Sequence, residues 1–284
     1  KKLQQMEIGE SNNISFSSED LDFQNSENYH LSVEIQKEQL SFCLLDTTKL
    51  EYIFLKSIKA NNPEEMVQLI NNEEILKNNF FSSSVSYKNF PSTIIPNQLY
   101  DATKKEVYAD FVIGETQKIK TDIIHHDDST ILYSVEENIT NTLNQIQIEI
   151  KEKNSSTVAI SSILNQYSGL KERSCFLIKE NNKIEIIVIQ DDQLILQNYF
   201  EVNSPTDVLY FTLFCFEQLK MDPNKNELYL IGNIEKGDET YSLLYDYIRN
   251  INFAKISGNL SFSKELHQII KHQYFTLFSQ ILCV

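Results

Sequence analysis

The chain contains 284 residues, enough to bury a large core in one large or two medium domains. Its 25 Lys and Arg against 40 Asp and Glu give a net charge of −15, which disfavours nucleic acid and anionic membrane surfaces as partners because both bind clustered cations. No apolar run reaches the ~20 residues of a membrane span and no signal peptide is apparent, so we expect a soluble cytoplasmic protein without direct membrane insertion.

The first elements are predicted within the opening third of the chain. Residues 1–28 are rich in Ser, Asn and acidic residues, which predicts a flexible N-terminal segment with one edge strand from Ile14 to Phe16. Residues 31–58 form three β-rich runs separated by polar turns, which predicts an antiparallel meander. Asn62 then caps a helix that Pro63 opens, because proline is favoured at the first helical position.

The middle of the chain predicts short alternating strands and helices. In chain order these are strands at Ser83–Tyr87 and Ser92–Ile95, a short helix opened by Pro96, strands at Ile119–His125 and Thr130–Val135, a helix at Glu136–Leu143, a strand at Gln145–Ile150, and a helix that Ser155 or Ser156 caps and that stops at Gly169.

The second half restarts with a similar meander from Arg173 and another helix opened by proline, at Pro205. Pro205 lies 142 residues after Pro63, and Lys179 lies 142 residues after Lys37. This common offset predicts an internal duplication, with a first domain at 29–170 and a second at 171–284.

The elements after Pro205 complete the second domain. The helix that Pro205 opens is apolar on nearly every side, which predicts that it lies inside the protein. A strand at Glu227–Ile231, a helix from Asp238, a strand at Phe253–Ile256 and a C-terminal helix from Ser263 follow.

Ligand-type residues are scattered along the chain. The four cysteines lie in apolar stretches without metal-ligand spacing, which favours reduced core thiols; they are Cys43, Cys175, Cys215 and Cys283. The cluster at 125–128 reads His-His-Asp-Asp, but neighbouring side chains of a strand point to opposite faces, so a polar hairpin tip explains it better than a metal site. No Gly-x-Ser-x-Gly motif marks a nucleophile.

Three segments carry a resemblance to a known family. They read "PSTIIPNQLYD" at 91–101, "SPTDVLYFTLFCFEQLKMDPNKNELYLIGNIEKGDETYSLLYDYIRNINF" at 204–253, and "HQYFTLF" at 272–278. On these segments the chain, from about Tyr29 onward, resembles a family of Bacteroidota proteins that is known only as a domain of unknown function and has an actin-like fold. The resemblance implies an α/β protein with duplicated actin-like (ribonuclease H-like) domains, in which mixed sheets are flanked by helices. It implies no established reaction.

The turns that would hold a nucleotide in this fold lack their usual residues. Actin-like ATPases grip phosphates with two hairpin turns that carry Asp and Gly, because only glycine lets backbone N–H groups wrap a phosphate. Here the turns read Glu34-Ile35-Gln36-Lys37 and Ile178-Lys179-Glu180-Asn181, and the adenosine-side loop "LIGNIE" contains Gly232 as its one glycine. We therefore expect no catalytic residue, no metal and no cofactor.

Two main hypotheses about function follow from this pattern. The first is a pseudo-ATPase: a non-catalytic interaction or scaffold protein that binds a protein partner in its cleft or at a sheet edge. The alternative is a divergent ATP-binding ATPase or kinase that contacts phosphate through Lys37, Lys179 and the backbone near Gly232, although charged turn residues are commonly solvated surface. A small-molecule sensor that uses the same cleft is a third possibility.

Overall fold

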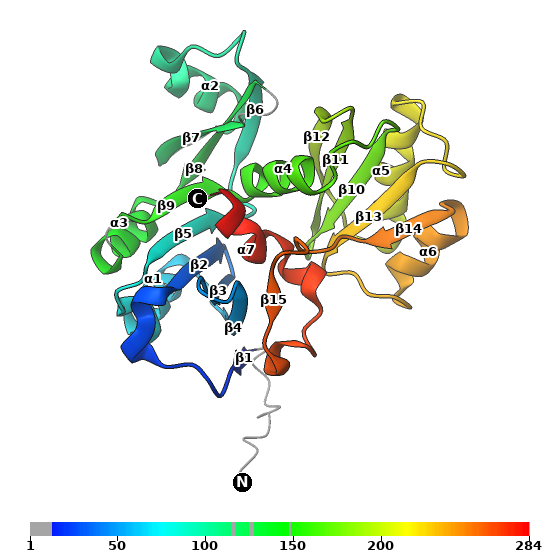
Figure 1. Cartoon of the computed structure of the whole chain (residues 1–284). Helices are drawn as coiled ribbons and strands as arrows, with labels where there is room; N and C mark the ends of the chain where they lie inside the picture. The colour runs from blue at the N-terminus through cyan, green and yellow to red at the C-terminus, as the bar shows by residue number, and fades with distance from the viewer. Residues whose placement is uncertain (1–12, 115–116, 125–127, 148, 284) are drawn as a thin grey trace.

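The structure is a computed structural model that describes residues 13–114, 117–124, 128–147 and 149–283 (Figure 1). The expectations about residues 1–12 and about the cluster positions 125–127 lie outside these residues. The edge strand expected near Ile14 is confirmed as β1, Ile14–Ser17, which pairs antiparallel with β4. In the described part of the chain, no helix combines the length and the apolar character needed to cross a bilayer.

The first lobe is built on a seven-stranded mixed sheet. Its strands run in the order β1-β4-β3-β2-β5-β9, and β15 pairs with β4 in addition. The strands after β1 are β2 Tyr29–Gln36, β3 Gln39–Asp46, β4 Glu51–Lys59, β5 Ser82–Tyr87, β9 Lys151–Asn154 and β15 Ser261–Phe262. β2, β3 and β4 form the predicted antiparallel meander, and α1, Pro63–Asn72, leads to β5, which lies parallel to β2.

The second lobe repeats this arrangement. Its five-stranded sheet has the order β12-β11-β10-β13-β14, which matches β4-β3-β2-β5-β9 strand for strand. The elements are β10 Ser174–Lys179, β11 Lys183–Gln190, β12 Gln193–Glu201, α5 Pro205–Gln218, β13 Glu227–Gly232, α6 Glu239–Tyr247 and β14 Asn250–Phe253. Helices α1 and α5 both begin at the predicted proline, so the predicted duplication and mixed-sheet fold class are confirmed.

The offset between the two repeats is not constant. β12 begins 142 residues after β4, but β11 begins 144 residues after β3, because the loop between the last two meander strands has four residues in the first lobe and two in the second. Lys37 therefore corresponds to Asn181 in the next hairpin turn. The pairing of Lys37 with Lys179 that the offset of 142 indicated is wrong, since Lys179 is the last residue of β10.

A small three-stranded sheet is inserted into the first lobe, with order β6-β8-β7. It consists of β6 Ser92–Pro96, β7 Lys118–Ile124 and β8 Ser129–Val135, with helix α2, Lys105–Val112, packed against it (Figure 1). Pro96 ends an edge strand here instead of opening a helix, which suits a residue without an N–H group. The next helical turn is capped by Asp101, whose side chain accepts the N–H of Thr103.

Two predictions about the end of the first half need correction. The segment Gln145–Ile150 was expected to be a strand, but helix α3, Glu137–Ile146, extends into it because Ile139, Leu143 and Ile146 share one helical face. Helix α4, Ser155–Gln166, is capped by Asn154 instead of a serine, with the Asn154 side chain accepting the N–H of Ser156.

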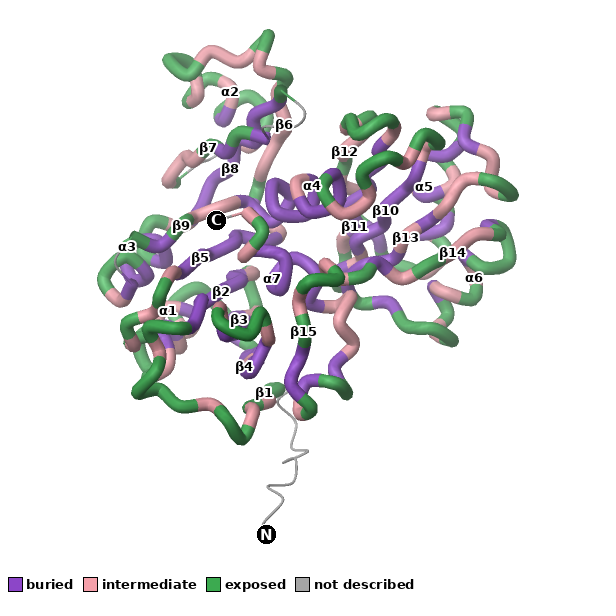
Figure 2. Tube along the Cα trace, viewed as in Figure 1, coloured by how far each residue is buried: buried purple, intermediate pink, exposed green. Residues whose placement is uncertain are grey.

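Helices α4 and α7 (Phe275–Ser279) lie in the middle of the molecule between the two large sheets (Figures 1 and 2). One hydrophobic cluster joins both lobes, since it contains Leu31 and Val85 of the first sheet, Ile160 of α4, and Phe176 and Ile187 of the second sheet. The two lobes therefore share a core and pack as one body.

The C-terminal residues differ from the predicted long helix. They form short 3-10 turns at Lys264–Leu266, Lys271–Tyr274 and Gln280–Cys283, and the five-residue helix α7. They also return to the first lobe, where β15 pairs with β4, although the predicted second domain covered 171–284. The domain boundary near residue 170 stays a prediction. The C-terminal segment that contains β15, however, packs on the sheet of the first lobe.

Helix α5 is not enclosed as predicted. Val208, Thr212 and Phe216 are buried, whereas Tyr210 is 61% exposed and Phe214 is 40% exposed. The helix therefore covers one face of the second sheet and presents aromatic side chains to solvent. The last strand of the second sheet, β14, also begins three residues earlier than the predicted Phe253–Ile256.

Candidate functional site

The candidate site lies where strands of both lobes end at the space between them. In open α/β sheets ligands bind beyond the carboxyl ends of parallel strands, and three charged residues lie at such ends here. Glu34 lies near the end of β2, Lys88 directly follows β5, and Glu180 directly follows β10. The duplicated fold thus brings two carboxylates and one ammonium group together from two lobes.

The three side chains form a buried ion bridge. Lys88 Nζ lies 2.5 Å from Glu180 Oε1 and 3.4 Å from Glu34 Oε1. The side chains are 5% exposed for Lys88, 10% for Glu180 and 2% for Glu34. The hydroxyl of Thr276 donates to the other oxygen of Glu34, so α7 also holds the bridge in place. Lys88 therefore links the first lobe to the second at the base of the cleft.

The electrostatics favour a charged lysine in this position. Burial alone would lower the pKa of Lys88, but the carboxylates of Glu180 and Glu34 outweigh it and hold that pKa above its ordinary value. Burial raises the pKa of Glu180 although Lys88 acts in the opposite direction. Two carboxylates share one ammonium group, so with both ionised the bridge carries a net charge of −1.

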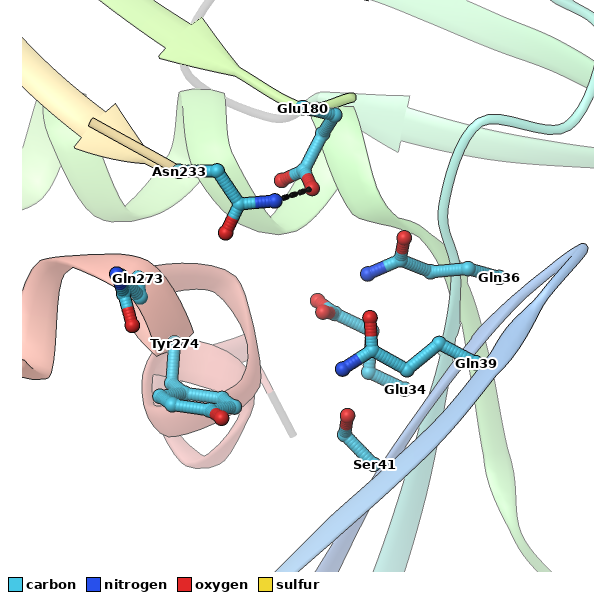
Figure 3. Close-up of a pocket in the computed structure, with 8 residues that line it drawn as sticks. All are labelled: Glu34, Gln36, Gln39, Ser41, Glu180, Asn233, Gln273 and Tyr274. Carbon is cyan, nitrogen blue, oxygen red and sulfur yellow. Dashed lines mark hydrogen bonds between the residues drawn. The ribbon is translucent and has the colours of Figure 1, made fainter. Parts of the chain in front are cut away.

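A narrow pocket opens beside the bridge (Figure 3). It is lined by eight residues: Glu34, Gln36, Gln39, Ser41, Glu180, Asn233, Gln273 and Tyr274. Its volume of about 30 Å³ holds one or two water molecules. The Asn233 amide donates to Glu180 at 3.4 Å, and the other polar side chains converge on the space from three elements (Figure 3).

Two of the four side-chain amides of this pocket donate to residues outside its lining. The Gln39 amide donates to the hydroxyl of Ser57 at 2.5 Å, and the Gln273 amide donates to Glu235 at 3.1 Å. Their carbonyl oxygens and the two carboxylates therefore make the lining rich in acceptors. Such a lining suits a cation or a hydrogen-bond donor and opposes a phosphate group.

The two turns quoted from the sequence contribute Glu34, Gln36 and Glu180 to this pocket, but the three candidate phosphate contacts, Lys37, Lys179 and Gly232, do not line it. Lys37 is exposed on the turn between β2 and β3. Lys179 donates its ammonium group to the backbone carbonyl of Asn233 at 3.1 Å. The structure thus brings Lys179 and Gly232 together as cross-strand neighbours of β10 and β13, but leaves Lys37 apart from them on the other lobe.

Gly232 has a structural role that its sequence position did not reveal. It adopts φ +84°, and a Cβ atom built there would lie 2.2 Å from the carbonyl oxygen of Lys179. Only glycine permits this close approach of the two strands. The glycine therefore shapes the end of the second sheet, and its presence needs no phosphate as an explanation.

Other ligand-type residues form no second centre. In the ranges that the structure describes, no group of three or more His, Cys, Asp or Glu is placed to hold a metal ion. The four cysteines are free; Cys43, Cys175 and Cys215 are buried, as the apolar sequence around them predicted.

The interlobe bridge was missed at the sequence level, although one signal pointed to it. Lys88 directly follows the strand predicted at Ser83–Tyr87, and the ends of such strands are where an α/β fold places its ligand site. Glu34 gave no such signal, because it alternates with Val33 and Ile35 as a solvent-facing residue would.

Comparison with known proteins agrees with this architecture. The sequence model of a family described as "Protein of unknown function (DUF3822)" matches residues 18–251. None of the curated proteins compared with the chain matches it.

Two solved structures are similar to this fold. One is a Bacteroides thetaiotaomicron protein with actin-like ATPase fold and unknown function, with a TM-score of 0.74 and 18% identity over 82% of this chain and 93% of that one. The other is the PilM-PilN type IV pilus biogenesis complex, with a TM-score of 0.59 and 12% identity over 89% of this chain and 98% of that one. The fold is therefore actin-like, as the resemblance implied.

Proposed function

Because the chain belongs to the DUF3822 family of proteins of unknown function and has an actin-like ATPase fold, we propose that it is a non-catalytic interaction protein that binds a protein partner. The observation that carries this proposal is the Glu34–Lys88–Glu180 bridge. It fills the base of the cleft with side chains of the chain itself.

The chemistry of the cleft argues against a triphosphate. Nucleotide phosphates are bound by backbone N–H groups, cations and Mg²⁺, which together neutralise several negative charges. Here Glu34 and Glu180 supply two carboxylates, and Lys88, the cation that forms ion pairs with them, is already bound to both. A phosphate group that entered would meet like charge in a space of about 30 Å³.

A divergent ATP-binding ATPase or kinase remains the second candidate, and the fold itself is what favours it. In that protein Lys37, Lys179 and the amides near Gly232 would contact the phosphates. Lys37 would have to reach the cleft from an exposed turn, and Lys179 would have to leave the Asn233 carbonyl. Because the enzyme requires both rearrangements and the interaction protein requires neither, we favour the interaction protein.

Protein binding fits what the same fold does elsewhere. The PilM-PilN structure is a complex that takes part in type IV pilus biogenesis, so an actin-like protein can act within a protein assembly. By analogy we propose a protein partner for this chain. We place it in the cytoplasm, because its four cysteines are free and three of them are buried.

Isothermal titration of the full chain with Mg-ATP tests the proposal. We expect no heat of binding at nucleotide concentrations up to the millimolar range. A dissociation constant in the low micromolar range that depends on Mg²⁺ would refute the proposal and favour the enzyme. In that case Lys37→Ala combined with Lys179→Ala must weaken binding, or the phosphate contacts assigned to these residues are wrong.

A further inference from the structure

Helix α2 turns an apolar face toward solvent. Val107 and Phe111 are 63% and 90% exposed, and Leu99, in the loop before the helix, is 70% exposed. Ala109, on the opposite side of the helix, is fully buried where α2 packs on the inserted sheet. None of the three exposed side chains belongs to a hydrophobic cluster of the described residues. An exposed apolar patch of this kind commonly marks an interaction surface.

This patch lies at the outer end of the inserted sheet, away from the two large sheets (Figure 1). The Tyr108 hydroxyl donates to the backbone carbonyl of Leu99 at 2.9 Å, so the loop and the helix form one surface. Figure 2 shows that most of α2 and of this loop is exposed or half-buried. The projecting position leaves room for another molecule to pack on the helix. We call Leu99, Val107 and Phe111 the α2 patch.

Two charged residues of α2 lie at the helix ends that disfavour them. Lys104 occupies the N-terminal cap and Asp110 lies in the last turn, and both are exposed. The helix dipole is positive at the N-terminus and negative at the C-terminus, so it repels both charges. The ion pair of Lys104 with Asp101, at 3.2 Å, is exposed and contributes little. Within one copy of the chain, therefore, the charges at the two ends of α2 are poorly compensated.

We propose that α2 pairs with α2 of a second copy of this chain, antiparallel about a two-fold axis. Lys104, Val107 and Phe111 share one helical face, because they are spaced by three and four residues. In the antiparallel pair the apolar residues of both copies pack in the centre. Lys104 of each copy then lies at the level of Asp110 of the other, so both ends of the helix meet the opposite charge.

Charge distinguishes a second copy from other occupants of the α2 patch. A partner surface with one sign of charge would compensate only one end of α2, whereas a second copy supplies both signs in the required order. An anionic membrane surface is opposed by the net charge of −15. The α2 patch exposes less area than the roughly 800 Å² per partner of a standard interface, so we expect a weak dimer.

Sedimentation velocity of the full chain over a concentration series tests the dimer. We expect the average mass to rise from that of one chain toward that of two chains as the concentration rises through the micromolar range. Val107→Glu combined with Phe111→Glu should weaken dimerisation about tenfold or more, because the dimer would bury four carboxylates in its apolar centre. A chain that stays monomeric up to the millimolar range, or a dimer that survives this double change, would overturn the proposal.

Tyr210→Glu combined with Phe214→Glu is the matched control. These aromatic residues of α5 are 61% and 40% exposed, but they lie on the second lobe outside the inserted sheet. The control variant should dimerise like the wild type. Loss of the dimer in this variant would place the contact on α5 and overturn the pairing through α2. Because α2 lies away from the Lys88 bridge, neither result depends on whether the cleft binds a nucleotide.

Exchange of the two charges tests the antiparallel arrangement itself. Lys104→Asp and Asp110→Lys each place like charges at both ends of the helix pair, so each variant alone should dimerise about tenfold more weakly. An equimolar mixture of the two variants should form a heterodimer, because every facing pair is then attractive. Both changes suit the helix dipole, so unfolding of α2 does not explain a weaker dimer. A mixture that associates no better than either variant alone would overturn the pairing.

Discussion

His30 shows how a buried titratable residue links stability to pH. Its ring nitrogens bond the hydroxyls of Ser82 at 2.7 Å and Ser84 at 3.1 Å, and the residue is fully buried on β2. Burial, with a smaller contribution from the charge of Lys151, lowers the pKa of His30 from 6.5 to about 4. The imidazole therefore stays neutral in the folded protein at pH values where it takes up a proton in the unfolded chain.

This lowered pKa predicts a loss of stability in mild acid. Between pH 6.5 and about 4 the unfolded chain binds more protons at His30 than the folded one, so the free energy of unfolding falls as the pH falls. The full effect is about 3 kcal/mol. Urea unfolding across this range should show a weaker pH dependence for His30→Gln than for the wild type. Gln268→Ala, at an exposed position, removes no titrating group and should keep the wild-type dependence.

Lys88 is the residue on which the interlobe bridge depends. Removing its ammonium group leaves Glu34 and Glu180 buried without a counter-ion, and breaking a buried ion pair from one side costs about 3–5 kcal/mol. We therefore expect Lys88→Met to lower the free energy of unfolding in urea by that amount.

A charge-free version of the bridge is the control for this prediction. Glu34→Gln, Lys88→Met and Glu180→Gln together remove all three charges, and neutral replacement of a buried ion pair is often tolerated. The triple variant should recover most of the stability that Lys88→Met loses. If Lys88→Met alone unfolds within about 1 kcal/mol of the wild type, the three groups do not form the buried bridge.

At the scale of single elements, the start of α5 is fixed by a capping box. The Ser204 hydroxyl accepts the N–H of Asp207 at 3.2 Å, and the Asp207 carboxylate accepts the N–H of Ser204 at 3.0 Å. Ser204→Ala should lower the free energy of unfolding by about 1 kcal/mol, because an orphaned helical N–H loses its acceptor. Thr206→Ala, in the same turn, makes no such contact and should change stability by less than half as much. Chemical denaturation of both variants checks the difference.

Local sequence patterns predicted most strands and helix starts correctly. The meanders, the two helices opened by Pro63 and Pro205, and the strands β5, β7, β8 and β13 follow from period-two alternation and from capping residues. Errors arose where long-range packing decided the outcome. Leu266, Tyr274 and Phe278 share a helical pattern, but they pack together with Tyr52 in one cluster, and this packing breaks the expected helix into short turns.

The site was less predictable than the fold, for a physical reason. Glu34 alternates with apolar residues and was expected on a polar face, but α7 covers that face and Thr276, 242 residues further along the chain, bonds its carboxylate. No local pattern contains such a contact. The absence of glycine in the hairpin turns was visible in the sequence, whereas the side chains that fill the cleft required the tertiary structure.

At the scale of the whole molecule, the two lobes are joined more closely than a hinged pair of domains. They share one hydrophobic cluster, the Lys88 bridge crosses between them, and the C-terminal segment runs from the second lobe back to the first. Domain motion that opens a cleft for a ligand would have to break these contacts together. The closed cleft supports the proposed binding of a partner on the outside of the protein.

Lys88 occupies the space between the lobes, and we propose that no nucleotide binds there. A crystal structure of the full chain grown with an excess of Mg-ATP tests it most directly. We predict that Lys88 Nζ lies between the carboxylates of Glu34 and Glu180 and that no nucleotide is bound there. A triphosphate with Mg²⁺ bound between the turns at Gln36 and Glu180, with Lys88 displaced from the carboxylates, would contradict it.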